Sequence, residues 1–387
     1  MYNSDKKRCP VKIAIIVPWI YAISGNITAI DLAAELQKKG YSVDFIVLEA
    51  FSEVVTELNR ELRGANLILF RKISKNKHGK LEYLVNQLLR DMGKELLKEL
   101  RKSENNLDYD VLLLISDEGV SLAKHIRNLN LRKTPLVCYS AMELVEHNFF
   151  LRKRSDQLLR NLLIYPMYLF LHRRFARLMS YYSLIFCNSE WTSMISNYFY
   201  NISSAGVIQS VSNVYFEAEL RQHSDTGGYL IAPTASFGKE EKKIVTQLRN
   251  SGFKIIFYGP VQIDDPDYLG FLPKQEMIEL ISSANALLFF FDYEALGLIP
   301  IESLALGTPV ITYLRQGPSM SIKDSECVTY VRNYNEILYA CKLAMQNPPS
   351  IEKKLKCRNS VIRFKPTINA ENFVRSVSQY NSENVNK

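Results

Sequence analysis

Residues 289–312, FFFDYEALGLIPIESLALGTPVIT, predict the local fold of their region and include two glutamates eight positions apart, Glu294 and Glu302. An apolar, strand-like run leads directly into Glu294, and a turn that contains Gly297 follows. Pro300 opens a predicted helix that carries Glu302 in its first turn. Strand, turn and helix in this order predict one unit of a parallel α/β sheet.

The two carboxylates stand on either side of a helix start. Backbone amides at such a terminus, aided by the helix dipole, suit a phosphate or diphosphate group. Carboxylates accept hydrogen bonds from hydroxyl groups, so Glu294 and Glu302 would hold a sugar or a ribose beside that phosphate. The helix dipole alone explains an acidic residue such as Glu302 in a first helical turn. It does not explain Glu294, which follows a strand, at the edge where open α/β sheets bind ligands. The pattern indicates a nucleotide-sugar site.

The helix is predicted to end at Gly307-Thr308-Pro309, before a second apolar strand at Val310–Thr312. The whole string EALGLIPIESLALGTPVI resembles the E-x7-E signature of glycosyltransferase family 4, the group 1 type. This resemblance implies a retaining, hexosyltransferase-like enzyme with the GT-B fold. In that fold two Rossmann-like domains face each other across a cleft, and a C-terminal helix returns to the first domain.

The length of 387 residues also favours two domains. We expect an acceptor-binding domain at residues 1–217 and a nucleotide-sugar-binding domain at 228–369, separated by a polar stretch. Residues 370–387 would form the returning helix. Apolar runs and helical periodicity predict the elements of both halves. A first strand with its outgoing loop is expected at 12–23, further strands are expected at 41–48, 66–71, 111–116, 136–140, 184–188, 228–233, 254–258, 286–291, 310–312 and 327–332, and the expected helices are 27–39, 82–102, 239–251, 274–284 and 335–347.

The resemblance assigns roles to further positions. Glu294 would contact the donor sugar, Glu302 the ribose, and the turn amides of Gly297 and Leu298 the diphosphate. Lys239 would offset the charge of the leaving group, although the arginine that the family places before it is absent. The remaining donor-binding positions are Gly25 near the phosphate, Glu143 near the sugar, Gly259 near the base, and Ala295 and Leu296 in the signature turn.

A different role is expected for the string Asn188-Ser189-Glu190-Trp191-Thr192, which also resembles a family motif. Its position directly after an apolar strand predicts that Ser189 caps the following helix. Direct contact with a ligand is the less favoured interpretation. Asn26 is a second predicted N-cap, for the helix that follows the first strand.

Composition limits the partners and the location. The chain has 48 Lys and Arg against 40 Asp and Glu, a net charge of +8, which favours anionic partners. Residues 152–177 combine arginines with ten apolar residues, so they would either touch an anionic membrane or form a buried helix. No motif supports nucleic-acid binding. Six scattered cysteines without metal-ligand spacing predict that the protein has no metal site and lies in the reducing cytoplasm. If residues 152–177 touch a membrane, the protein would bind peripherally to its inner face.

The predicted reaction transfers a sugar from a nucleotide-sugar donor to a hydroxyl group of a glycan or lipid-linked acceptor. The nucleotide sugar is a substrate, and no cofactor is expected. Two alternatives remain at this point. A sugar-nucleotide epimerase shares the architecture, and a degenerate relative would bind a glycan or a membrane surface without catalysis.

Overall fold

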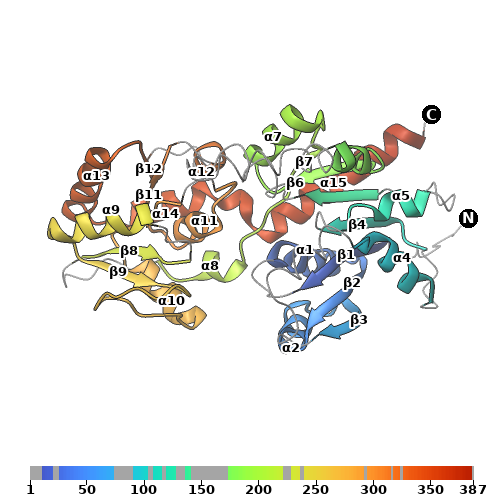
Figure 1. Ribbon diagram of the computed structural model, residues 1–387, viewed down its shortest axis with the longest axis horizontal. Helices are drawn as coiled ribbons and strands as arrows, with labels where there is room; N and C mark the ends of the chain where they lie inside the picture. The colour runs from blue at the N-terminus through green and yellow to red at the C-terminus, as the bar shows by residue number, and fades with distance from the viewer. Residues whose placement is uncertain are drawn as a thin grey trace, which may run out of the picture.

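Two parallel sheets, each covered by helices, form the two lobes of the molecule (Figure 1). The computed structural model describes residues 11–20, 26–73, 90–102, 108–115, 119–127, 136–140, 173–220, 228–235, 239–291, 294–314, 317–322 and 326–385.

The first sheet has seven strands in the order β3-β2-β1-β4-β5-β6-β7. All of its pairings are parallel, which requires a crossover after each strand. The strands are β1 (Lys12–Ile20), β2 (Ser42–Phe51), β3 (Asn66–Ile73), β4 (Val111–Ile115), β5 (Leu136–Ser140), β6 (Leu184–Cys187) and β7 (Gly206–Val207). The helices are α1 (Ile27–Lys38), α2 (Ser52–Glu61), α4 (Met92–Lys102), α5 (Leu122–Arg127) and α7 (Glu190–Tyr200), and residues 173–179 are also helical.

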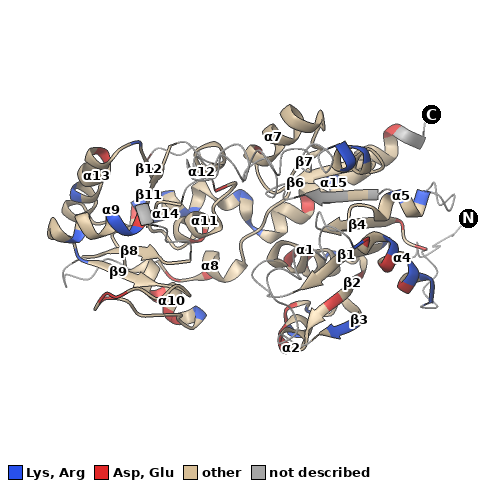
Figure 2. Cartoon of the chain, in the orientation of Figure 1, with Lys and Arg blue, Asp and Glu red and all other residues tan. Residues whose placement is uncertain are grey.

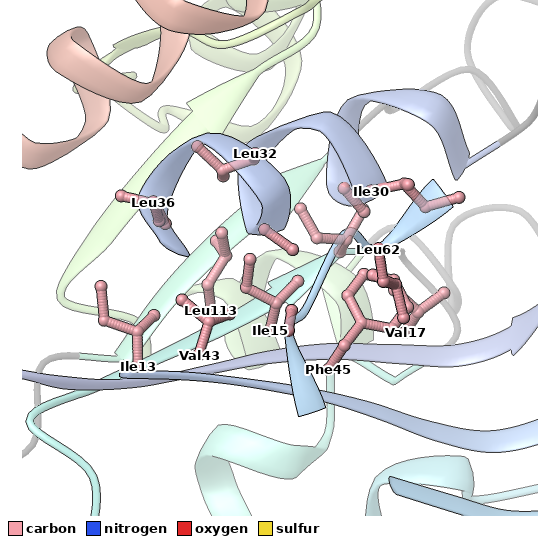
Figure 3. Packing of buried hydrophobic residues seen from close by; sticks show 14 of the residues in the cluster. Ile13, Ile15, Val17, Ile30, Leu32, Leu36, Val43, Phe45, Leu62 and Leu113 are labelled. Carbon is pink, nitrogen blue, oxygen red and sulfur yellow. The ribbon is translucent and has the colours of Figure 1, made fainter. Parts of the chain in front are cut away.

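The strand β1 lies inside this sheet, between β2 and β4, and is apolar on both faces. Figure 3 shows Ile13, Ile15 and Val17 packed with Leu32 and Leu36 of α1 in one buried cluster. The alternate side chains of β1 point to the opposite face, where they pack with residues of α4 and α5. A strand covered by helices on both faces must be hydrophobic throughout, which explains the continuous apolar run in the sequence.

The second sheet has five parallel strands in the order β12-β11-β10-β8-β9. Its strands are β8 (Leu230–Pro233), β9 (Ile255–Tyr258), β10 (Ala286–Phe289), β11 (Val310–Tyr313) and β12 (Val328–Val331). The helices are α9 (Lys239–Asn250), α10 (Lys274–Ser282), α11 (Leu298–Ala305), α12 (Gly317–Ser321), α13 (Tyr334–Gln346) and α14 (Ile351–Ser360). The strand order reverses between β8 and β10, the kind of position where open sheets of this type bind ligands.

The chain crosses between the sheets twice, and the crossings are bonded to each other. The amide of Val211 donates to the carbonyl oxygen of Phe364 at 3.0 Å. The short helix α8 (Asn213–Glu217) follows the first crossing, and its Tyr215 and Phe216 pack in a core cluster of the second sheet. After the second crossing, which includes the 3-10 turn η5 (Ile362–Phe364), the helix α15 (Pro366–Val385) runs along the first lobe (Figure 1).

The C-terminal helix returns to the first sheet, as the sequence predicted. Ala370, Phe373 and Val377 of α15 belong to the same buried cluster as β1 and α1. The rings of Phe186 on β6 and Phe373 lie 5.8 Å apart, centroid to centroid. Two parallel sheets with a returning helix confirm the predicted α/β fold class.

Two local predictions were wrong. The helix predicted at residues 82–102 begins at Met92 among the described residues, because Arg90 and Asp91 are not helical and residues 82–89 lie outside that part of the chain. The helix α11 begins at Leu298 and not at Pro300, so Glu302 lies in its second turn. A residue in the second turn keeps its side chain close to the helix start, since side chains tilt toward the N-terminus.

Candidate functional site

Three residues follow the carboxyl ends of neighbouring strands in the second sheet. Thr234 follows β8, Gly259 follows β9, and Glu294 stands beyond the end of β10. Because parallel strands end at the same edge of a sheet, these residues gather on one side of the second lobe. They define the candidate site, and the sequence had singled out Gly259 and Glu294.

The signature turn is held by the carboxylate of Glu294 itself. Its Oε1 accepts hydrogen bonds from the amides of Gly297 at 3.2 Å and Leu296 at 3.4 Å. Gly297 is the N-cap of α11 and has a φ of +81°, a left-handed conformation that favours glycine. Ala295 and Leu296 are buried, whereas Glu294 and Leu298 are half-buried. In this structure the amide of Gly297, which was expected to bind a diphosphate, is thus bonded to Glu294.

The helix α12 packs against the back of that turn. The amide of Gly317 donates to the carbonyl oxygen of Glu294 at 2.8 Å. A Cβ atom added to Gly317 would lie only 1.8 Å from the carbonyl oxygen of Ala295. A Cβ atom on Gly297 would lie 3.0 Å from side-chain atoms of both Pro300 and Pro318. The backbones of α12 and of the turn therefore approach as closely as two glycines permit.

Glu302 occupies a different environment, formed by aromatic side chains and one lysine. Burial raises the pKa of Glu302 to about 7, while the hydrogen bond from Tyr215 and the charge of Lys274 oppose that rise. Burial and then the charge of Glu302 raise the pKa values of both Tyr215 and Tyr258. A carboxyl group whose pKa is raised in this way is a common feature of functional sites.

Lys274 connects this environment to the first lobe. Its Nζ lies 5.5 Å from the centre of the Tyr215 ring, a cation–π distance. Asp31 of α1 has its pKa raised to about 6 by burial, while a hydrogen bond from Ser210 at 3.1 Å and the charge of Lys274 lower it. Lys274 therefore acts electrostatically on a carboxylate from each lobe. Of this group only Glu302 was predicted from the sequence, because Asp31, Tyr215 and Lys274 lie far apart in the chain and match no motif.

The side chain of Thr234 has no hydrogen-bond partner among the described residues although it is fully buried. A Cβ atom on Gly259 would lie 2.9 Å from the Thr234 Oγ1, and Gly259 has a φ of +127°. Buried hydroxyl groups are normally paired. An unpaired one beside a glycine, at the ligand edge of the sheet, indicates where a polar group of a ligand would bind.

For three of the predicted site residues, the whole residue or its side chain lies outside the part of the chain that the structure describes. Gly25 and Glu143 lie outside the described residues. Lys239 is the first residue of α9, and its side chain lies outside the description. The structure therefore brings together Gly259 and the signature turn on one edge of the second sheet, with Glu302 beside them on α11.

Other expectations concern metals and membranes. Across the described ranges, no cluster of His, Cys, Asp and Glu could hold a metal ion. Within the same ranges, no helix has the length and apolarity needed to cross a bilayer. Most of the basic window 152–177 is not described, but Arg173, Arg174 and Arg177 are exposed on a helical segment that carries basic side chains (Figure 2). Contact with a membrane remains a prediction.

Comparison with solved structures identifies the fold. A sucrose-phosphate synthase from Thermosynechococcus elongatus superposes with a TM-score of 0.65 at 13% identity, covering 96% of this chain and 100% of the other. Anabaena HepE, solved in complex with UDP, gives 0.62 at 13% identity, covering 95% and 100%. A glycosyltransferase from Rickettsia africae gives 0.62 at 12% identity, covering 96% and 98%. The fold is the GT-B fold of glycosyltransferases.

Part of the chain also matches a protein family in sequence. Residues 263–362 match the model of the family described as glycosyl transferases group 1, and this range contains the whole signature turn, α11 and α12. The match confirms the resemblance seen in the signature stretch. No curated protein matches the chain in sequence.

Proposed function

We propose that this protein is a retaining glycosyltransferase that moves a sugar from a nucleotide-sugar donor to a hydroxyl group of a glycan or a lipid-linked acceptor. The group 1 family match and the GT-B fold support glycosyl transfer. The donor class is supported by a neighbour of the same fold, HepE, which was solved with UDP and with UDP and glucose.

One observation carries the proposal: the signature turn lies at the carboxyl edge of the second sheet with a carboxylate on each side of a helix start. Glu294 precedes α11 and Glu302 lies within it. In the proposed complex the donor diphosphate competes with Glu294 for the amides of the turn, which frees this carboxylate for the hydroxyl groups of the sugar. The ionised form of Glu302 accepts hydrogen bonds from the ribose.

The proposed reaction keeps the anomeric configuration by attack on the same face of the sugar that the diphosphate leaves. The acceptor oxygen forms the new bond to the anomeric carbon while the bond from that carbon to the phosphate oxygen breaks. The leaving diphosphate takes the acceptor proton. Amides at the start of α11 and the side chain of Lys239 would stabilise the negative charge of the diphosphate as it leaves. This mechanism uses the nucleotide sugar as a substrate, with no resident cofactor.

Release of nucleoside diphosphate from a panel of nucleotide sugars tests the proposal. We expect the full-length protein to release diphosphate from at least one donor, and Glu294→Ala to lower the rate by at least ~100-fold, the order of effect for an electrostatic contact with reacting groups. Glu352→Ala is a matched control, since its side chain is 82% exposed on α14. It should retain full activity.

The outcomes separate the alternatives. Release that depends on Glu294 supports the transferase. Isomerisation of the sugar without release would instead show an epimerase. If no nucleotide sugar or nucleoside diphosphate of the panel raises the melting temperature of the protein, the donor site does not exist and the proposal is wrong.

A further inference from the structure

Glu190, the first residue of α7, makes contacts that its position in a capping motif does not explain. Its Oε1 accepts a hydrogen bond from Arg363 Nη1 at 2.6 Å, and its Oε2 accepts one from Ser321 Oγ at 3.0 Å. Arg363 Nη2 also donates to the carbonyl oxygen of Ser321 at 2.6 Å. The three residues form a closed triangle of hydrogen bonds in which both carboxylate oxygens are used.

The members of this triangle come from three different parts of the molecule. Glu190 belongs to the first lobe, Ser321 ends α12 in the second lobe, and Arg363 lies in η5 at the second crossing. Figure 1 shows α7 and α12 on the same side of the molecule, one from each lobe. The Glu190 side chain is 29% exposed, so its bond to arginine is partly shielded from water. Charge-assisted bonds of this kind are stronger than neutral ones.

The other end of α12 fixes the signature turn. Gly317, at the start of the helix, donates to the carbonyl oxygen of Glu294 at 2.8 Å. Its contact with Ala295 leaves no room even for a methyl group. A five-residue helix is too short to bend between its ends, so its position at Ser321 determines its position at Gly317. The triangle and the turn are therefore connected through one rigid segment.

We propose that Glu190 is a positioning residue for the donor site. By binding Ser321 and Arg363 together, it fixes α12 relative to the first lobe, and α12 in turn fixes the backbone of the Glu294 turn. The arrangement of the two lobes thereby sets the geometry of the residues that hold the donor. The structural connection stands on the contacts alone, and its consequence for donor binding rests on the proposed function.

Hydrogen–deuterium exchange of the full-length protein tests the structural connection without any ligand. In Glu190→Gln, which keeps the shape but loses the charge, we expect amides in segments 294–298 and 317–322 to exchange at least threefold faster. Glu190→Ala should raise their exchange about tenfold. Exchange of β1 and β2 should not change, because these strands belong to the first sheet and carry none of the three residues of the triangle.

Two further variants make the result specific. Glu326→Gln removes the same charge from an exposed carboxylate of the second lobe, which pairs with Lys356 at 3.2 Å, and should change exchange in neither segment. Ser321→Ala removes one side of the triangle and should loosen the same two segments as Glu190→Ala, but less. Unchanged exchange in these segments in both Glu190 variants, or equal loosening throughout both sheets, overturns the proposal.

Titration with UDP tests the functional consequence. If wild-type protein binds UDP, Glu190→Ala should weaken binding about fivefold, and Glu190→Gln less. In turnover the KM for the donor should rise and kcat should fall as well, because the turn both binds the donor and stabilises the diphosphate as it leaves. A loosened turn with unchanged UDP affinity and KM contradicts the positioning role. Failure of wild-type protein to bind any nucleotide contradicts the proposed function instead and leaves the exchange result standing.

Discussion

The hydroxyl group of Tyr215 donates a hydrogen bond to the carboxylate of Glu302, and this links the segment between the two sheets to the signature helix. Tyr215 lies on α8, directly after the first crossing, whereas Glu302 lies on α11. A carboxylate that would bind ribose is therefore prepared by a residue outside the signature. The protonation state of Glu302 depends on that residue, because burial alone pushes the pKa of a carboxyl group upward.

Tyr215→Phe should shift the pH dependence of nucleotide binding. Burial raises the pKa of Glu302 to about 7, and the Tyr215 hydroxyl restrains that rise. A hydrogen bond to a charged group contributes about 1.5 kcal/mol, which corresponds to about one pH unit. The pH midpoint of UDP binding, measured by calorimetry from pH 5.5 to 9, should therefore rise by about one unit. Binding strengthens as the pH rises, since only the ionised carboxylate accepts bonds from both ribose hydroxyls.

Tyr229→Phe is the control for that shift. The hydroxyl of Tyr229 donates to the carbonyl oxygen of Leu280 at 2.6 Å, and Tyr229 is not among the groups that shift the pKa of Glu302. Its removal should leave the pH midpoint unchanged. Identical midpoints in wild type and Tyr215→Phe would show that Glu302 does not control nucleotide binding.

Glu302→Gln should stabilise the protein and impair nucleotide binding. The pKa of Glu302 in the folded protein, about 7, lies above its ordinary value of 4.5, so between pH 4.5 and pH 7 the native state keeps a proton that the unfolded state has lost. Stability therefore falls as the pH rises from 4.5 to 7. Gln cannot ionise and still accepts a bond from Tyr215. Urea unfolding should show a gain of about 1–3 kcal/mol at pH 8 and a smaller gain at pH 5.

The same variant should bind UDP about tenfold more weakly, because a neutral amide oxygen accepts hydrogen bonds less strongly than a carboxylate. Greater stability together with weaker binding is the expected behaviour of a residue kept for function. If Glu302→Gln were destabilised equally at pH 5 and pH 8, the carboxyl group would not be desolvated in the native state.

The elements that the sequence predicted are those encoded by local patterns. The start of α9 at Lys239, the strand β5 at Leu136–Ser140 and the cap at Ser189 follow from periodicity or from single residue types. Asn26 shows the limit of such signals: it is the N-cap of α1 by position, but its side chain makes no capping hydrogen bond.

The contacts that were not predicted are long-range. Tyr215 meets Glu302 because α8 packs into the core of the second sheet, and Glu190 meets Arg363 because the second crossing passes beside the first lobe. No spacing rule brings such pairs together. The bond from the Gly297 amide to Glu294 was also missed, since a sequence pattern shows which groups lie in a turn but not which of them pair.

Gly307→Ala should destabilise the second domain by more than backbone strain alone. Gly307 ends α11 with a φ of +84°, and a Cβ atom there would lie 2.7 Å from the Cβ of Lys354 and 2.8 Å from the Cδ2 of Leu220. Strain at a left-handed position costs about 1 kcal/mol, and the clash adds about 1–2 kcal/mol. Chemical unfolding monitored by a probe in the second lobe should show a loss of stability equal to the sum of these two costs.

Gly252→Ala provides the comparison, because Gly252 has a φ of +87° with no atom within 4 Å of an added Cβ. Gly252→Ala should lose only about 1 kcal/mol of stability, the cost of the backbone strain. Equal losses in the two variants would mean that the neighbours of Gly307 move aside without cost, and that the close packing of α11 on α14 is not rigid.

Ser189→Ala should destabilise the first domain, whereas Ser350→Ala should have a smaller effect. Both serines are N-caps: Ser189 Oγ accepts from the Thr192 amide at 3.0 Å, and Ser350 Oγ accepts from the Lys353 amide at 3.2 Å. Ser189 is fully buried and Ser350 is exposed, so water can replace only the second cap. We expect losses of about 2 kcal/mol and about 0.5 kcal/mol in urea unfolding. Glu190 follows Ser189 in the chain and binds Ser321, so Ser189→Ala should also increase hydrogen–deuterium exchange in segment 317–322. A loss of stability without that change would show that the cap and the triangle act independently.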